Sequence, residues 1–299
     1  MRRVPIVLNI ASGGSHGQVT YNEVRRLFSL HGIEADILTA EDGKGLEAQV
    51  REALRTSPEV VVAAGGDGTV STVAALLRGT GVALGVLPAG TLNHFARDLG
   101  IPTDLEGAVA AIAQGAPVDV DVGEVNGRTF VNNASLGLYP QIVRHRKRRQ
   151  ELYGHGKYWA MLGATLTVLG RNPFLRLKLQ LDDRVERCRT PFVFIGNNDY
   201  VMEGFSIGTR SSLRDGKLSI YTTQRRTRGG LVRLAFRALL GRLSQAKDFA
   251  VNSASSVRID SKRRYMLVAT DGEVTAMETP LNFRVLPGAL SVILPPKAA

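Results

Sequence analysis

Residues 60–69, VVVAAGGDGT, decide how this chain folds. The first five residues are all apolar, which is typical of a short strand covered on both faces of a parallel sheet. Three glycines and a carboxylate, Asp67, follow at once, and residues 69–78 then have a helical pattern that ends at Gly79. Glycines allow a backbone to approach a ligand closely, and the N–H groups at a helix start attract anions. The stretch therefore predicts a phosphate-binding turn; an ordinary strand–helix turn is the alternative.

Two other predicted strands end in loops of the same kind. Residues 82–87 lead into PAGTLN at 88–93, and residues 4–10 lead into NIASGG at 9–14. The carboxyl ends of parallel strands meet at one edge of a sheet, where ligands bind in open α/β folds. Three such loops predict a nucleotide site, and Asp67 is suited to a nearby Mg²⁺ or ribose. Neither a Walker A motif nor a G-x-G-x-x-G fingerprint occurs in the sequence.

Strands and helices alternate through the first part of the chain. A weaker strand is predicted at residues 33–38, and helices are predicted at 20–31, 46–54 and 93–99. This βαβ series indicates an open sheet with helices on both faces, which is a three-layer α/β domain.

The pattern changes near Asp119. Residues 124–130, EVNGRTF, predict a hairpin turning at Asn-Gly, and 175–181 alternate leucine with polar residues up to a turn at Asp182-Asp183. Further strands are predicted at 191–195, 218–222, 257–260, 265–269, 282–286 and 290–294, with helices near 157–169 and 229–243. We therefore expect an α/β domain at residues 1–123 and a β-rich, sandwich-like domain at 124–299. Packing of the last strands against the first domain is an open alternative.

Composition limits the possible partners. The 299 residues carry 38 Lys and Arg against 27 Asp and Glu, a net charge of +11 that attracts phosphate-bearing molecules. Aromatic residues make up only 6%, which disfavours nucleic acid. The single cysteine, Cys188, excludes a disulfide framework. A cytoplasmic protein fits this cysteine usage. The longest apolar run, at residues 158–170, is shorter than the ~20 residues of a membrane span.

The motifs together resemble the diacylglycerol kinase catalytic family of lipid kinases, which includes bacterial diacylglycerol and sphingosine-type kinases. GGDGT is followed by PAGTLNHFAR at 88–97 and by a late DGE at 271–273. The segment DVGEVNGRTFVNNASLG, IGNN at 195–198 and DGKL at 215–218 also match. GGDGT alone is shared with NAD kinases and resembles phosphofructokinases, whereas the combination is specific to lipid kinases. The resemblance covers nearly the whole chain and implies an active site between the two domains.

The resemblance implies roles for individual residues. It places ATP on the loops, with Mg²⁺ bridging its phosphates, and Asp271 of DGE as the general base for a lipid hydroxyl, with Glu273 of the same turn as the second choice. A turn residue is the alternative for Asp271, because Asp-Gly favours hairpins. A structural Mg²⁺ is expected at Asp215 with the main-chain carbonyls of Ser212 and Lys217, and Asp121 is expected in the metal and water network. The nucleotide contacts are expected from Asn9, Ser12, Gly13, Thr39, Gly65, Gly66, Asp67, Gly68, Thr69, Gly90, Thr91 and Asn93.

Three departures from the family pattern keep other functions open. His94 stands where the family usually has Asp, the first loop is NIASGG rather than NPxSG, and EGFSIGTR at 203–210 replaces a glycine run. A catalytically silent nucleotide- or lipid-binding protein is one alternative, and a kinase of a soluble substrate such as NAD is another. His94 either replaces the carboxylate or caps a helix start, and we favour a changed local network over metal ligation.

Two arginine-rich segments predict how a lipid kinase without a membrane span would meet its substrate. Residues 144–149 are RHRKRR, and 225–242 combine arginines with an apolar helical pattern. Both suit the anionic inner face of a membrane, with peripheral binding; a core helix with a solvated rim is the alternative for the second. The sequence leaves the lipid and the oligomeric state open, a homodimer included.

Overall fold

The computed structural model describes residues 2–10, 21–141, 143, 174–203, 206–210, 212–223, 227, 229–230 and 249–296. The chain forms two compact units. Unit 1 comprises residues 1–122, 212–214 and 286–299, and unit 2 comprises residues 123–211 and 215–285. We propose residues 1–123 and 124–299 as the two domains, and the last residues of the chain, 286–299, belong to the first compact unit.

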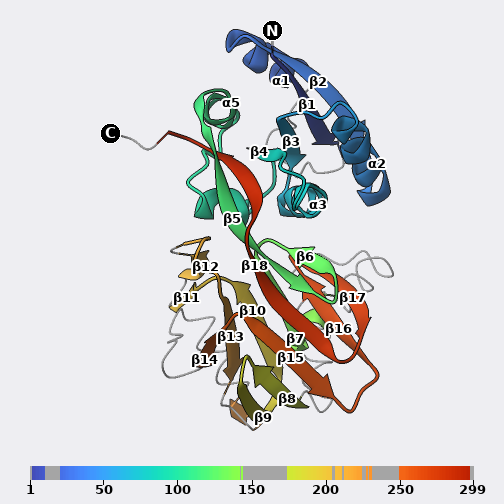
Figure 1. The fold of residues 1–299 in the computed structure, drawn as a ribbon, viewed down its shortest axis with the longest axis vertical. Coiled ribbons are helices and arrows are strands. Elements are labelled where there is room, and N and C mark those ends of the chain that lie inside the picture. The colour runs from blue at the N-terminus through green and yellow to red at the C-terminus, as the bar shows by residue number, and fades with distance from the viewer. Residues whose placement is uncertain are drawn as a thin grey trace. The chain divides into compact units, whose positions relative to one another are not determined.

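Unit 1 contains a parallel sheet with a layer of helices on each side (Figure 1). The strand order is β2-β1-β3-β4, and the end of β18 pairs with β4 in parallel. Helix α1 contacts α5, whereas α2 contacts α3. The elements are β1 (Arg2–Asn9), α1 (Tyr21–Leu30), β2 (Ile33–Ala40), α2 (Gly43–Leu54), β3 (Val60–Gly65), α3 (Asp67–Leu77), β4 (Ala83–Pro88), α4 (His94–Asp98), α5 (Leu105–Gln114) and the start of β5 (Ala116–Val125).

Unit 2 is built mainly from two antiparallel sheets. In one of them β15 lies between β18 and β8, and β8 pairs with β9; the other has the order β14-β13-β10-β7-β16-β17. Buried side chains from both sheets form one core, as in a sandwich. The elements are β6 (Arg128–Phe130), β7 (Asn133–Gly137), β8 (Leu175–Leu181), β9 (Arg184–Thr190), β10 (Phe192–Asn197), β11 (Tyr200–Glu203), β12 (Ser206–Arg210), β13 (Leu218–Thr223), β14 (Phe249–Ala254), β15 (Ser256–Ser261), β16 (Tyr265–Thr270), β17 (Glu273–Glu278) and β18 (Leu281–Leu294).

The predicted fold class is confirmed, and several elements have the predicted limits. Strand β8 runs over Leu175–Leu181, and its leucines are all buried while Arg176, Lys178 and Gln180 are exposed. Asn126 and Gly127 both have positive φ, 46° and 86°, as the predicted tight turn between β5 and β6 requires. No described helix is long and apolar enough to cross a membrane.

Other elements differ from the prediction. Residues 282–286 and 290–294 were expected as two strands, but they belong to one strand, β18, which pairs with β15, β5 and β4. Where the pattern breaks, the Gly288 N–H donates a hydrogen bond to Asp121 Oδ1 at 2.9 Å. The structure adds α5, β7, β11, β12, β14 and β17. The helix expected near 157–169 and nearly all of the one expected near 229–243 lie outside the described residues, as do the arginine-rich segments apart from positions 227, 229 and 230.

Candidate functional site

The loops after β3 and β4 touch each other through their glycines. A Cβ built on Gly90 would lie 2.7 Å from the Cα of Gly66, and one built on Gly66 would lie 3.4 Å from the Cα of Gly90. The backbones therefore approach more closely than side chains allow at Gly90. Adjacent parallel strands β3 and β4 bring these loops together, with Gly65 opposite Pro88 in the register. We call this contact the glycine junction.

Asn93 holds the second loop in place. Its Oδ1 accepts a hydrogen bond from the Gly90 N–H at 3.0 Å, and its Nδ2 donates to the Gly90 carbonyl at 2.9 Å. The residue has a left-handed backbone (φ 50°) and is buried, which Asn tolerates better than most residues. Because both polar atoms of its side chain are bonded to Gly90, Asn93 is a positioning residue for the glycine junction. Thr91 and His94 on either side are exposed.

Helix α3 starts at Asp67 without a side-chain cap. Its N-cap is Gly66, whereas α2 and α5 begin with carboxylate caps, Asp42 and Asp104, that each accept a backbone N–H at 2.7 Å. The first N–H groups of a helix have no partner within it, so an uncapped start suits an external anion. Asp67 Oδ1 lies 3.5 Å from the N–H of Phe95, at the start of α4.

The other nucleotide candidates that the structure describes lie along the same sheet edge. Asn9, at the end of β1, donates from Nδ2 to Thr69 Oγ1 at 2.9 Å, so the first loop and the start of α3 are linked by side chains. Thr69 is buried, and a Cβ on Gly65 would lie 2.4 Å from its Oγ1. Thr39, near the end of β2, and Gly68 are exposed. Ser12 and Gly13 lie outside the described residues.

In unit 2, Asp271 occupies the tight turn between β16 and β17. Its φ is 48° and that of Gly272 is 88°, so the turn interpretation of Asp-Gly holds. Its carboxylate also accepts three backbone N–H bonds, from Val131 (2.8 Å), Asn132 (2.8 Å) and Asn133 (3.1 Å). Asp271 therefore ties the segment before β7 to this turn.

Glu273 begins β17 and has a different environment. Its Oε2 lies 2.5 Å from Arg128 Nη2, and 62% of its side chain is exposed. Arg128 is itself fixed, because its Nε donates to Thr270 Oγ1 and its Nη1 to Thr275 Oγ1, at 2.9 and 3.0 Å. The Glu273 carboxylate is thus oriented by a rigid guanidinium and remains accessible to solvent.

A buried arginine supports this region, and sequence reasoning missed it. Arg210 is 7% exposed and donates to the Val131 carbonyl at 2.7 Å and to Asn132 Oδ1 at 2.8 Å. Nearby, the buried Nδ2 of Asn198 has no hydrogen-bond partner among the described residues. Arg210 therefore fixes the segment that Asp271 also binds. The only signal in the sequence was the unusual EGFSIGTR, which gives no indication of contacts about 80 positions away.

The predicted metal ligands are oxygen donors of the type that Mg²⁺ prefers. Asp121 is buried and lies beside the 212–214 segment, since its N–H donates to the Leu213 carbonyl at 2.8 Å. Asp215 is exposed, and its N–H donates to Asn198 Oδ1 at 3.1 Å. The Lys217 carbonyl already accepts the Asn198 N–H at 3.0 Å. Among the described residues no three His, Cys, Asp or Glu side chains cluster as a metal site, so a set built on the carbonyls of Ser212 and Lys217 stays a prediction.

An ion pair fixes the side chain of Lys217. Its Nζ lies 2.7 Å from Asp199 Oδ2. The hydrogen bond to Asp199 raises the pKa of the Lys217 ammonium. Partial burial raises the pKa of Asp199, but hydrogen bonds from Lys217 and Ser219 outweigh it, so this pKa is lowered. Both groups therefore remain charged at neutral pH.

Two protein families match the chain. The diacylglycerol kinase catalytic domain matches residues 3–125, and the YegS C-terminal NAD kinase beta sandwich-like domain matches residues 134–294. The second match alone spans more than half of the chain.

Relatives align over nearly their whole length. A protein of Klebsiella pneumoniae (strain 342) named "probable lipid kinase YegS-like" is 29% identical, over 99% of this chain and 98% of its own. A "diacylglycerol kinase" of Bacillus subtilis (strain 168) is 27% identical, over 100% and 98%. The crystal structure of a diacylglycerol kinase from Bacillus anthracis (strain Sterne) superposes with a TM-score of 0.72 at 21% identity, covering 100% of this chain and 98% of that chain. The last comparison shows a shared fold.

Proposed function

We propose that this chain, which belongs to the diacylglycerol kinase catalytic-domain family, transfers the γ-phosphate of ATP to a hydroxyl group of a lipid. Its relatives are lipid kinases by name, so a kinase activity follows from the family. The observation that carries the proposal for ATP is the glycine junction between Gly66 and Gly90 beside the uncapped start of α3. This arrangement fits a polyphosphate, because the start of α3 offers backbone N–H groups and the glycines leave no side chain in the way.

Each loop residue has a distinct part in holding the nucleotide. We assign the phosphates to the N–H groups at the start of α3 and to the Gly90 loop, which Asn93 keeps in shape. Thr69, held by Asn9, fixes the beginning of the helix. Asp67 is the carboxylate nearest in sequence to these N–H groups. We propose it as a ligand of a metal ion that binds together with the nucleotide. Mg²⁺, when bound there, would supply positive charge that neutralises the phosphates.

Glu273 is the carboxylate that we assign to proton transfer. A general base must accept a proton from the attacking hydroxyl, so it needs an accessible oxygen. Glu273 is largely exposed and oriented by Arg128, whereas both oxygens of Asp271 accept backbone N–H bonds. These contacts support Asp271 as a positioning residue. We therefore assign the general base to Glu273, although the motif alone allows either carboxylate.

The site of action and the alternatives follow from the same proposal. We propose a cytoplasmic enzyme that binds the inner face of the membrane peripherally and uses Mg²⁺, with Asp215, Asp121 and the carbonyls of Ser212 and Lys217 at a structural metal. A silent binding protein is disfavoured because GGDGT and DGE are both intact. An NAD kinase is disfavoured by the lipid-kinase names of the relatives.

Release of ADP tests this function in solution. We expect the protein to produce ADP from ATP only when neutral detergent micelles contain a lipid alcohol, because the hydroxyl is the acceptor. Chelation of Mg²⁺ should abolish the reaction, since the phosphate charge is then not neutralised. ADP production that needs no lipid, or that rises instead with NAD, would contradict the proposal.

A further inference from the structure

One face of the sheet containing β8, β9 and β15 is strongly basic. The opposite face supplies the buried leucines of β8 to the core. Because side chains alternate along a strand, the outward positions share the other face. They are Arg176, Lys178 and Gln180 on β8, Val185, Arg187 and Arg189 on β9, and Arg258 and Asp260 on β15, with Lys262 just beyond it. We call this surface the basic face.

Like charges lie directly opposite each other on the basic face. In the antiparallel register of β8 and β9, Arg176 is the partner of Arg189, and Lys178 is the partner of Arg187. Such pairs destabilise a sheet. Charges on the edge strand β9 would protect it from strand-to-strand aggregation, but that purpose does not explain basic side chains on the inner strand β8.

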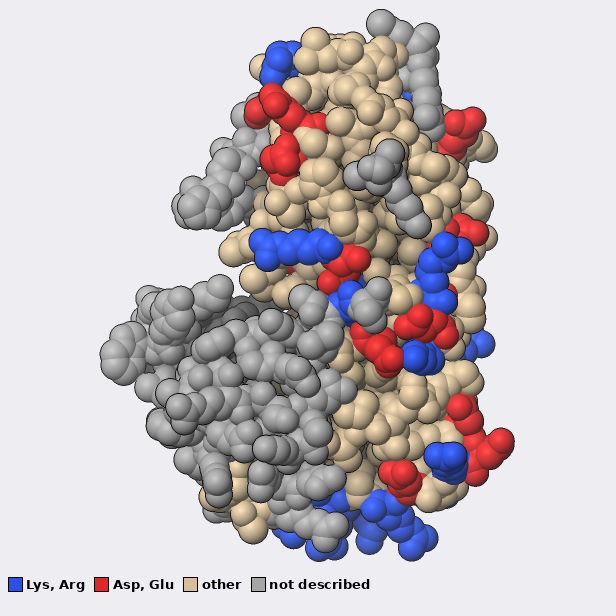
Figure 2. Space-filling view, turned by 90° about the vertical axis from the view of Figure 1, so that its left-hand side faces the viewer, with Lys and Arg blue, Asp and Glu red and all other residues tan. Residues whose placement is uncertain are grey.

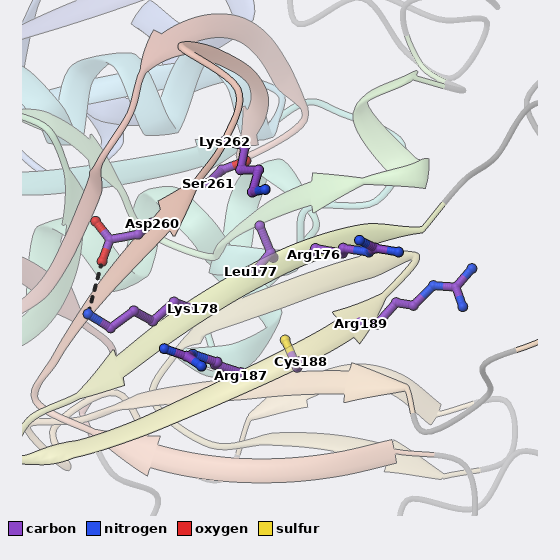
Figure 3. A pocket seen from close by; sticks show the side chains of 9 residues that line it. All are labelled: Arg176, Leu177, Lys178, Arg187, Cys188, Arg189, Asp260, Ser261 and Lys262. Atoms are coloured by element: carbon purple, nitrogen blue, oxygen red, sulfur yellow. Dashed lines mark ion pairs between the residues drawn. The ribbon is translucent and has the colours of Figure 1, made fainter.

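Most of the charged side chains of the basic face line an open hollow of about 610 Å³. Figure 3 shows arginine and lysine side chains from both strands around it, together with Lys262. The one carboxylate in the lining, Asp260, is shared between Lys178 (4.0 Å) and Arg258 (3.2 Å). Burial raises the pKa of the Cys188 thiol to about 11, so this thiol is neutral at physiological pH. The hollow therefore has an excess of positive charge.

Several of these cations lack an ion-pair partner within the part of the chain that the structure describes. They are Arg176, Arg187 and Lys262, while Arg189 lies over the ring of Phe174 at 4.8 Å. The exposed Val185 adds an apolar side chain to the same face. Figure 2 shows Lys and Arg side chains gathered at the lower end of unit 2, where Figure 1 places β8 and β9. The planar fork of arginine matches the geometry of phosphate and binds it through two hydrogen bonds.

We propose that the basic face docks the protein on an anionic phospholipid bilayer, with headgroup phosphates in the hollow between β8 and β9. The proposal rests on the lipid kinase function, because an enzyme with a bilayer substrate must meet a surface of phosphates. Broad exposure, several cations at the rim and an exposed valine fit such a surface better than a single small anion. The bilayer compensates the like-charge pairs that the sheet alone leaves unfavourable.

Sedimentation with vesicles tests the docking surface. Arg176→Glu and Arg187→Glu together should lower partitioning onto phosphatidylglycerol-containing vesicles by at least about 100-fold at low salt, since two charges close to the lipid are reversed. The melting temperature should stay the same or rise, because each like-charge pair becomes an opposite-charge pair. The matched control is Arg26→Glu with Arg51→Glu, two exposed residues of unit 1 that give the same change in net charge. It should retain binding within about threefold.

Other outcomes would overturn the proposal. Equal loss of binding in both double variants would make net charge the cause, and equal wild-type binding to phosphatidylcholine vesicles would remove the role of anionic lipid. Displacement by inorganic phosphate, but not by chloride at the same ionic strength, would assign the hollow to free phosphate. In neutral micelles the variant should phosphorylate lipid at the wild-type rate. Wild-type protein that binds anionic vesicles but phosphorylates no lipid there would contradict the kinase function alone.

Discussion

Glu273→Gln is expected to lower kcat by about 100-fold or more while ATP affinity and the melting temperature stay unchanged, which is the size of a lost general base. The physical reason is that glutamine keeps the shape and can still accept a hydrogen bond from Arg128, but it cannot take up the proton of the hydroxyl. Steady-state kinetics in lipid micelles, with calorimetric ATP binding, measure both quantities. Glu278→Gln is the matched control, because Glu278 lies on the same strand and also pairs with an exposed arginine, Arg264 (3.1 Å).

Asp271→Asn separates the two carboxylates. Its amide group would meet backbone N–H donors from Val131, Asn132 or Asn133 where the carboxylate accepts hydrogen bonds. We therefore expect a lower melting temperature together with a loss of activity. An inactive Asp271→Asn with an unchanged melting temperature, beside an active Glu273→Gln, would exchange the two roles. Full activity in both variants would rule out the DGE segment as the source of the base.

Gly90→Ala is expected to weaken ATP binding strongly without unfolding the protein. The new methyl group would lie 2.7 Å from the Cα of Gly66 and 2.8 Å from Asn93 Oδ1, so the backbones of the two loops must separate. Donors displaced by about 1 Å lose most of their value to a bound phosphate, as catalytic geometries generally do. We expect ATP affinity to fall at least ~100-fold, which titration calorimetry would detect. Gly66→Val should act in the same way, because its branched side chain extends toward Gly90.

Gly43→Ala is the control for the glycine junction. Gly43 starts α2 in unit 1, and a Cβ there meets nothing within 4 Å. This variant should bind ATP as the wild type does. Normal ATP use by Gly90→Ala with an unaltered thermal melt would show that the junction between the loops does not form the nucleotide site.

Local patterns predicted much of the fold. The alternation of leucine with polar residues predicted β8 to the residue, and Asn126-Gly127 predicted a turn whose two positive φ angles are observed. Pro287 and Gly288 interrupt the pattern of the last strand, so two strands were expected. The single strand β18 is held by pairing with β15, β5 and β4, and the Gly288 N–H donates to Asp121, a residue 167 positions away. Such a contact leaves no signal in the local sequence.

In the candidate site too, local patterns were predictable from the sequence, whereas contacts between distant residues were not. The strand–glycine–helix order around Asp67 predicted a loop at the sheet edge, and the structure places Gly66 and Gly90 in contact there. The interactions of Asp271 could not be predicted, because its three N–H donors come from a segment about 140 positions earlier in the chain. Arg210 was missed for the same reason. Motifs record which residue types a site uses, whereas their hydrogen-bond partners depend on the tertiary fold.

The fate of the γ-phosphate tests the central claim most directly. Protein incubated with γ-labelled ATP and Mg²⁺ should transfer the label to an organic-soluble product when micelles contain diacylglycerol, a sphingoid base or another lipid alcohol, and Gly90→Ala should give none. Label that stays in inorganic phosphate, or that moves to NAD in the aqueous phase, would contradict the assignment of this chain as a lipid kinase.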